Sequence, residues 1–238
     1  MCGRYVTATP PEQLAEEFHV DAVKAEPLAP KYNVAPTDDV YAIAISRDGL
    51  RQLGTFKWGL VPSWAKDPSI GSRMINARAE TVSSKPAFRR LLQKRRCILP
   101  ADGFYEWQKG EGGPSRPFFV RRRDGEPLAF AGLWQPVRLE SGERLETCAI
   151  LTTAASPLLR PIHSRMPVML RPDAIDAWLD PTVRTPEFLQ TLLEQPLPDA
   201  ELEAYEVGRA VNSPRHDGPE LAERQAAEPP GPAQARLL

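Results

Sequence analysis

The 238 residues of this chain are enough for one full-sized domain with a substantial core. Hydrophobic residues make up 42% and charged residues 26%, as in ordinary soluble globular proteins. No apolar run reaches the roughly 18 residues of a membrane span, and the first residues lack the basic and apolar regions of a secretory signal. The three cysteines have no metal-binding spacing, so we expect a reducing cytoplasm, no metal and no cofactor.

The net charge of −1 hides a local asymmetry. Residues 71–123 contain thirteen Lys or Arg against four Asp or Glu. The phosphate backbone of a nucleic acid would interact with the local charge of this segment rather than with the net charge of the chain. The alternative is a solvated basic face with no ligand.

The 26 prolines predict a loop-rich fold of short elements. Taken in chain order, we expect a helix over residues 11–18, a β-hairpin around Arg47-Asp48-Gly49 and a basic helix over residues 84–96. Strands follow over residues 96–107, 117–122, 128–136 and 146–153, then helices over 172–179 and 186–194, and a last strand over 202–211.

This order predicts an α+β fold: a single domain with a mainly antiparallel, barrel-like β core and peripheral short helices. We expect the domain to cover residues 1–213. Residues 214–238 are rich in Pro, Ala and Glu and poor in large apolar side chains, which predicts a disordered tail.

The most reactive group in the sequence is Cys2, because removal of Met1 would give it a free α-amine beside its thiol. The unperturbed pKa of such an amine is about 7.7–8.0 and that of a thiol about 8.5. An exposed aminothiol of this kind can attack a carbonyl as an N-terminal nucleophile. It can also condense with an aldehyde to a Schiff base and close a thiazolidine ring. An accidental cysteine at position 2 is the alternative.

Two further groups could move protons. Glu106 lies between Tyr105 and Trp107, an apolar setting that would raise the pKa of a carboxyl, although an alternating strand could equally turn it to solvent. His163, followed by Ser164 and Arg165, could be a catalyst or a structural histidine.

Six motifs occur together in a fixed order: MCGRY at residues 1–5, YNVAP at 32–36, KWGLVPSWAKD at 57–67, INARAET at 75–81, ILPADGFYEW at 98–107 and IHSRMP at 162–167. The ordered set resembles the SOS-response-associated peptidase (SRAP) family, whose members are also called abasic-site processing proteins. The resemblance extends from residue 1 to about residue 215.

The resemblance implies a catalytic set of four residues. Cys2 is similar to the residue that forms a thiazolidine with the ring-opened sugar of an abasic site. Asn76 is similar to the asparagine that holds the terminus and sugar. Glu106 corresponds to the carboxylate that assists ring opening, and His163 to the histidine that moves protons at the Schiff-base stage.

The resemblance also implies a DNA-binding set. Its arginines correspond to phosphate contacts, and Asn33, Pro36 and Trp64 correspond to the surface for the flanking strand. The family's second tryptophan is replaced by Ala65 in this chain. The complete set is Arg4, Asn33, Pro36, Trp64, Arg78, Thr153, Ser164 and Arg165.

These features predict a protein that senses abasic sites in single-stranded DNA and shields them by forming a covalent thiazolidine crosslink through Cys2. We also expect the protein to remove its own Met1 and to be capable of Schiff-base lyase activity. Two alternatives remain at this point: an N-terminal-nucleophile peptidase or amidohydrolase, and a non-covalent single-strand-binding module. The expected partners are abasic single-stranded DNA and replication or repair proteins, with no membrane. We expect a cytoplasmic monomer, associated with the nucleoid when it is bound to DNA.

Overall fold

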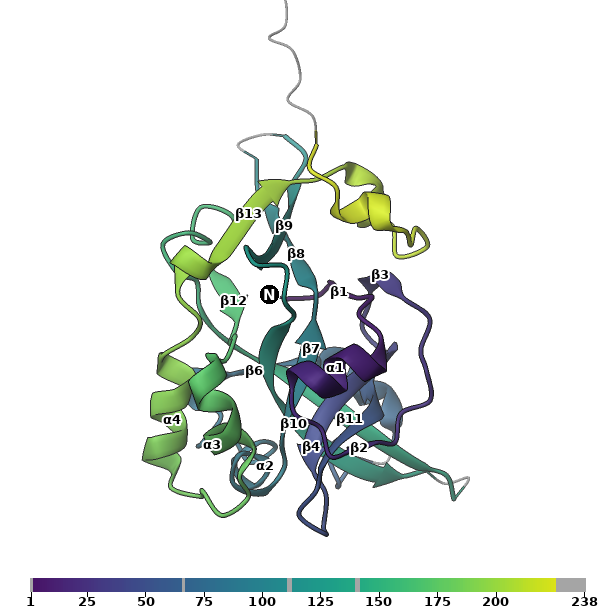
Figure 1. Cartoon of the computed structure of the whole chain (residues 1–238), viewed down its shortest axis with the longest axis vertical. Coiled ribbons are helices and arrows are strands. Elements are labelled where there is room, and N and C mark those ends of the chain that lie inside the picture. The colour runs from purple at the N-terminus through teal and green to yellow at the C-terminus, as the bar shows by residue number, and fades with distance from the viewer. Residues whose placement is uncertain (1, 66, 111–112, 140–141, 226–238) are drawn as a thin grey trace, which may run out of the picture.

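The computed structural model describes residues 2–65, 67–110, 113–139 and 142–225. Two β-sheets form the centre of the molecule, and short helices lie at its edges (Figure 1). The strands are β1 (Tyr5–Thr7), β2 (Ala22–Val23), β3 (Lys31–Val34), β4 (Asp39–Ile45), β5 (Arg51–Trp58), β6 (Asn76–Arg78), β7 (Arg96–Ala101), β8 (Gly103–Gln108), β9 (Arg116–Arg122), β10 (Leu128–Arg138), β11 (Arg144–Ala154), β12 (Arg165–Pro167) and β13 (Leu202–Glu206).

Five strands close into a barrel. Antiparallel pairing joins β11, β10, β7, β4 and β5 in that order, and a parallel pairing of β5 with β11 completes the ring. Full closure removes the exposed strand edges that an open sheet would present. The prediction of an α+β fold with a mainly antiparallel, barrel-like core is confirmed.

Both faces of the barrel strands are buried, and successive side chains alternate between them. Cys97 and Leu99 of β7 pack in one cluster, to which all five barrel strands contribute. Ile98 between them joins a second cluster, which includes apolar residues of all four α-helices. The first cluster therefore fills the barrel, and the second lies between the barrel and its helices.

The second sheet holds the N-terminal strand in its interior. Its order is β13, β9, β8, β1 and β3, so β1 pairs with a strand on each side. Tyr5 of β1 is fully buried in the barrel-filling cluster, where its ring meets Trp58 and Phe130 edge-on at centroid distances of 5.1 and 6.0 Å. The start of the chain thus covers one end of the barrel.

The expected strand over residues 96–107 is wrong in one respect, because it is two strands that belong to different sheets. Asp102 separates them, and its carboxylate accepts hydrogen bonds from the backbone N–H groups of Ala8 and Thr9 at 2.6 and 3.2 Å. At Gly103 a Cβ atom would lie 2.3 Å from the Phe119 ring. Glycine is required there because β8 approaches β9 so closely.

The helices occur where they are expected, with changed limits. The basic helix begins later than residue 84, because residues 84–88 form hydrogen-bonded turns before it. No helix in the described part of the chain is long and apolar enough to cross a membrane. The α-helices are α1 (Pro11–Glu17), α2 (Arg89–Lys94), α3 (Ile175–Leu179) and α4 (Pro186–Glu194).

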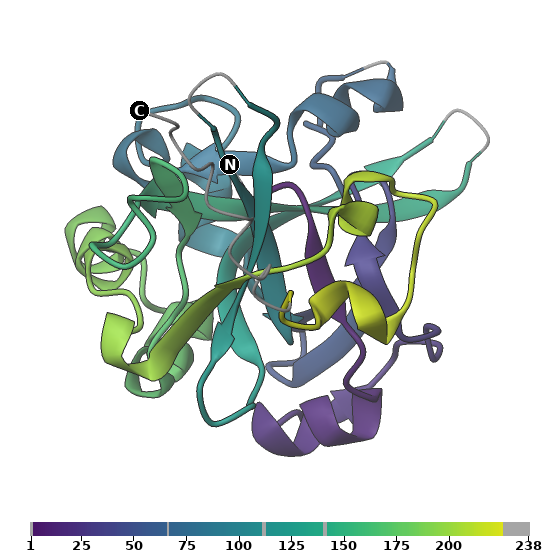
Figure 2. The same cartoon turned by 90° about the horizontal axis from the view of Figure 1, so that it is seen from above.

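The expected last strand stops at Glu206, and the expected tail is wrong for residues 214–225. Leu221 is 2% exposed and packs with Val6, Tyr105 and Val211. The backbone N–H of Gln225 donates to Glu206 O at 2.8 Å. Figure 2 shows this C-terminal segment in yellow, lying across the second sheet. One well-placed leucine and backbone pairing order a segment whose average composition predicts disorder, while residues 226–238 lie outside the described residues.

We expect Leu221→Ala to lower the free energy of unfolding by about 2–4 kcal/mol, because it leaves a cavity in a buried cluster. Urea denaturation followed by circular dichroism measures this change. The matched control is Leu50→Ala, whose side chain is 43% exposed and should cost less than about 0.5 kcal/mol. Equal stability of the two variants would show that residues 214–225 do not pack on the domain in solution.

Candidate active site

Cys2 lies three residues before β1, and the pairing of that strand fixes its place. The backbone N–H of Tyr105 donates to Arg4 O at 3.0 Å, which extends the β1–β8 pairing toward the terminus. Asn76 Nδ2 donates to Cys2 O at 2.8 Å from the other side. Cys2 is 0% exposed, so the expectation of an exposed thiol is wrong. Met1 lies outside the described residues.

Burial raises the pKa of the Cys2 thiol well above its usual range, and the nearby Glu106 carboxylate raises it further. The thiol is therefore protonated at neutral pH in this arrangement. A protonated, buried thiol is a poor nucleophile. For reaction, its proton must move to an acceptor at the moment when the sulfur forms a bond.

Glu106 provides a carboxyl group on β8 at the same site. The residue is 5% exposed, in agreement with the apolar setting expected from Tyr105 and Trp107, and in disagreement with a solvent-facing position. Burial raises the pKa of Glu106, and the nearby charge of His163 partly opposes that rise. A carboxyl group with a raised pKa can exchange protons closer to neutral pH than an exposed one.

Asn76 begins β6, which pairs in parallel with β11 and places Asn76 opposite Ile150. While its Nδ2 holds the Cys2 carbonyl, its Oδ1 is buried with no hydrogen-bond partner among the described residues. A buried, unused acceptor is costly in the absence of a ligand. The side chain can therefore accept one further N–H or O–H group.

His163 lies just before β12, which pairs with the end of β11. The backbone N–H of Arg165 donates to His163 Nδ1 at 3.0 Å. Nδ1 also lies 3.2 Å from the backbone oxygen of Arg165, so both polar atoms of the Arg165 backbone meet this ring nitrogen. These two contacts fix the orientation of the ring.

Two members of the expected DNA-binding set make contacts inside the protein. Asn33 is 0% exposed, and its Nδ2 donates to the carbonyl oxygens of Ser213 at 3.0 Å and His216 at 2.9 Å. Arg4 Nη1 donates to Asn33 Oδ1 at 2.8 Å and to Val211 O at 3.2 Å. The burial of Asn33 does not fit a direct contact of its side chain with a strand. Instead, it fixes the C-terminal segment to β3.

Arg165 is also held in place, by a residue that the sequence analysis missed. Its guanidinium meets the Glu80 carboxylate at 2.6 and 3.0 Å, and Nη2 donates to Thr152 O at 2.6 Å. Glu80 stands in the same INARAET motif as Asn76 and Arg78, so the motif contained the signal.

Other members of the set are accessible. Arg78 and Ser164 are exposed, and Pro36 and Thr153 are half-buried. Trp64 is 67% exposed, far more than the other large apolar side chains that reach the surface. These groups could meet a ligand without any change of the fold.

The basic segment 71–123 does not form one charged face, contrary to the simplest expectation. Arg116 and Arg121 pair with Glu206 and Glu203 on β13. Arg96 is 4% exposed and donates to backbone carbonyl oxygens at the ends of α2 and α3. The charge of Arg96 therefore stabilises the packing of α2 and α3. A count of charges along the chain overestimates the number of cations that are free to bind phosphate.

The described residues contain no group of three or more His, Cys, Asp or Glu that could hold a metal ion.

Comparison with known proteins gives consistent results. The profile of the SOS response associated peptidase (SRAP) family matches residues 1–214. The abasic site processing protein YoqW of Bacillus subtilis (strain 168) is 42% identical over 224 residues, which cover 94% of this chain and 99% of that protein. YedK of Escherichia coli (strain K12), also named an abasic site processing protein, is 34% identical over 226 residues, or 93% and 98% of the two chains.

The fold is also similar to that of a solved structure. A crystal structure of a Bacteroides thetaiotaomicron protein matches with a TM-score of 0.83 and 26% identity, over 94% of this chain and 100% of that one. The profile match over nearly the whole described chain and the identity to YoqW establish the relationship, and the chain belongs to the SOS response associated peptidase (SRAP) family.

Proposed function

We propose that this protein processes abasic sites in single-stranded DNA and captures them covalently through Cys2 once Met1 has been removed. The relatives named abasic site processing proteins support the substrate. The observation that carries the chemistry is the position of Cys2, whose carbonyl bonds to Asn76 and whose thiol is electrostatically coupled to Glu106. An abasic site offers an aldehyde, the group that an aminothiol selects.

The order of bond formation follows from the protonation states. The α-amine of Cys2 adds to the aldehyde carbon, and loss of one water gives a Schiff base. The thiol then adds across the C=N bond, with sulfur bonding to carbon and the thiol proton transferred to nitrogen. The product is a thiazolidine, and the overall reaction releases one water. Because burial keeps the thiol protonated, the amine reacts first.

The neighbouring side chains have complementary roles in this proposal. Glu106, with its raised pKa, donates a proton during opening of the sugar ring, and during ring closure it accepts the thiol proton and passes it to the nitrogen. His163, whose ring is oriented by the backbone of Arg165, transfers protons at the Schiff-base stage, where breakdown to a strand break would constitute lyase activity. Asn76 Oδ1 accepts a hydrogen bond from the amine or the sugar.

The strand is held by contacts that do not depend on the lesion. Arg78, Arg165 and Arg4 lie near the ends of the segments that carry Asn76, His163 and Cys2, and we assign phosphate contacts to them. Ser164, Thr153, Pro36 and Trp64 extend this surface. Removal of Met1 is hydrolysis of the Met1–Cys2 peptide bond, with water as nucleophile. We assign it to the same site, which would account for the peptidase in the family name.

Cys2→Ala should abolish the crosslink to a single-stranded oligonucleotide that carries one abasic site. Denaturing gels and intact mass after incubation measure the adduct, whose mass should equal protein plus DNA minus one water. Cys97→Ala and Cys148→Ala are matched controls, because these two buried thiols lie in the same cluster and should not affect capture. A denaturant-stable adduct of Cys2→Ala at the wild-type level would falsify the thiazolidine mechanism.

Glu106→Gln should slow adduct formation by about a hundredfold to ten-thousandfold, because it retains the shape but cannot transfer a proton. A time course of capture beside an equilibrium titration with undamaged single strands separates rate from affinity. The affinity should stay unchanged. Glu206→Gln on β13, which removes a partly exposed ion pair, should leave the rate at the wild-type value. A loss of affinity proportional to the loss of rate would mean that Glu106 positions DNA rather than protons.

The stability of the protein should show the cost of ionising Glu106. Its pKa is raised in the folded state, so ionisation is disfavoured there relative to the unfolded chain. Wild-type stability should therefore fall, relative to Glu106→Gln, as pH rises from about 4.3 through the raised pKa. Thermal unfolding of both proteins across this range tests the sign. A wild-type protein that gains stability over Glu106→Gln with rising pH would show that the carboxylate is stabilised by its neighbours instead.

A further inference from the structure

Phe118 of β9 lies opposite Glu106 of β8. The register of the two strands pairs these residues directly, and side chains in that relation have Cβ atoms about 4.5–5.5 Å apart. We propose that Phe118 shields the Glu106 carboxyl from water, as a positioning residue that acts on the reaction through that carboxyl. The consequence for catalysis rests on the proposed function, whereas the shielding itself does not.

The chain neighbours of Glu106 lie on the other face of the second sheet, because successive side chains of a strand point to opposite faces. Tyr105 belongs to the cluster on that other face, and Trp107 packs against it. Phe118 instead packs against the barrel-filling cluster, to which Cys2 belongs. The apolar setting of Glu106 therefore comes from β9, across the sheet, and not from the residues beside it in the sequence.

The pairs between β8 and β9 change from apolar to polar along this face. The preceding pair, Phe104 and Val120, is fully buried. The following pair, half-buried Gln108 and exposed Arg116, reaches the surface. The pair between them forms the boundary, with a carboxyl residue that is 5% exposed opposite a half-buried ring. Loss of the ring would open the carboxyl to water from the surface side.

Contacts with Arg116 hold the ring in place. The guanidinium carbon of Arg116 lies 5.6 Å from the centre of the Phe118 ring. Arg116 pairs with Glu206, the residue opposite Phe118 on β13. It also donates to Gln108 Oε1 at 3.3 Å. The arginine that lies diagonally across the strands from Glu106 therefore has other acceptors.

The charged and titratable groups around Glu106 belong to several segments of the chain. They are the Cys2 thiol, the terminal amine, the His163 imidazole and, diagonally across the sheet, Arg116. Phe118→Ala removes none of these groups but admits water, which favours the charged form of a carboxyl. Burial is the main cause that raises the pKa of Glu106, so this variant should lower that pKa.

NMR titration of the glutamate carboxyl carbons, in the protein without DNA, tests the shield, with Glu106→Gln to assign the signal. The Glu106 midpoint should move to lower pH in Phe118→Ala and remain near the wild-type value in Phe118→Leu, which retains an apolar cover. Phe188→Ala is the matched control, because that ring is 46% exposed on α4 and its loss should leave the midpoint unchanged. An unchanged midpoint in folded Phe118→Ala would overturn the proposal. If Phe118→Ala does not fold, Phe118→Thr takes its place, since a β-branched residue suits a strand.

The double variant Phe118→Ala/Arg116→Gln separates the effect of water from that of charge. Removal of the ring frees Arg116 as well as admitting water, and a nearby cation also lowers the pKa of a carboxyl. The midpoint should stay low in the double variant, because water still reaches Glu106. A midpoint that returned to the wild-type value would assign the shift to Arg116 and refute the shield.

The pH–rate profile of capture, with a single-stranded abasic oligonucleotide, provides the catalytic readout. The limb that requires protonated Glu106 should move to lower pH in Phe118→Ala by the same interval as the NMR midpoint, with unchanged affinity for undamaged strands. The rate at neutral pH should fall by less than the roughly hundredfold minimum expected for Glu106→Gln. An unmoved profile with lost affinity would make Phe118 a DNA contact instead. If the wild type captured no lesion, the proposed function would fail, while the titration would still decide the shield.

Discussion

The structure depends on the fixed position of the chain's first strand. The first residues of a domain ordinarily fray, because few contacts hold them. Here β1 is an interior strand with β8 on one side and β3 on the other, and the side chain of Tyr5 enters the cluster that fills the barrel. Cys2 belongs to the same cluster. The backbone that carries the proposed nucleophile is therefore as constrained as the core, and its α-amine needs no separate loop to orient it.

The same burial determines how the site can react. Removing the thiol of Cys2 and the carboxyl of Glu106 from water raises the pKa of both, and the Glu106 carboxylate reinforces the effect on the thiol. The thiol therefore holds its proton until a substrate changes the local charge, and Glu106 takes up a proton more readily than an exposed carboxylate does. A Schiff base introduces a positive charge at the terminus, which would favour ionisation of both. The chemistry proposed for this site thus begins at the amine and activates the sulfur afterwards.

Local structure could be predicted from the sequence, whereas pairing between strands far apart in the chain could not. The hairpin at Gly49, whose φ is +80°, follows from turn chemistry alone. The parallel pairing of β5 with β11 joins residues about ninety positions apart, and alternation of apolar residues contains no signal for it. The buried Asn33 shows the same limit within the site: a motif identifies a polar residue but not whether it faces a ligand or, as here, the carbonyl groups of a C-terminal segment.

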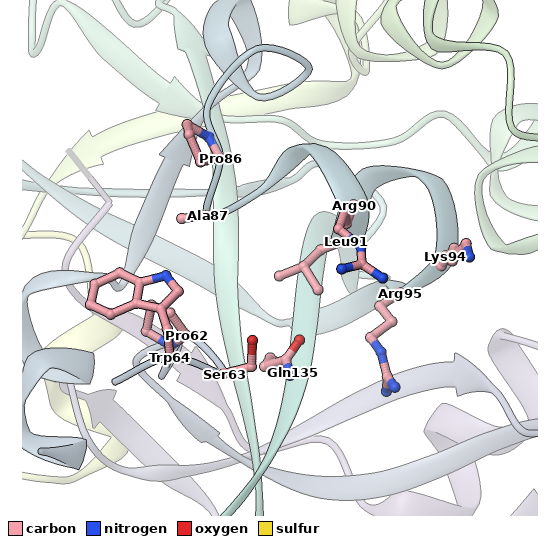
Figure 3. A pocket seen from close by; sticks show the side chains of 10 residues that line it. All are labelled: Pro62, Ser63, Trp64, Pro86, Ala87, Arg90, Leu91, Lys94, Arg95 and Gln135. Atoms are coloured by element: carbon pink, nitrogen blue, oxygen red, sulfur yellow. The ribbon is translucent and has the colours of Figure 1, made fainter. Parts of the chain in front are cut away.

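The cations illustrate why charge along the chain is a poor guide to binding surfaces. Arg165 is oriented by Thr152 O and by Glu80, whose side chain is 46% exposed. An ion pair this open to water contributes little stability, so a phosphate can replace the Glu80 carboxylate at small cost while the carbonyl keeps the guanidinium in place. Arg90 and Lys94 of α2 (Figure 3), by contrast, are exposed and form no ion pair with another described residue. A guanidinium that is oriented in advance suits a strand that must be placed accurately for chemistry, so charge alone does not distinguish such a cation from a solvated one.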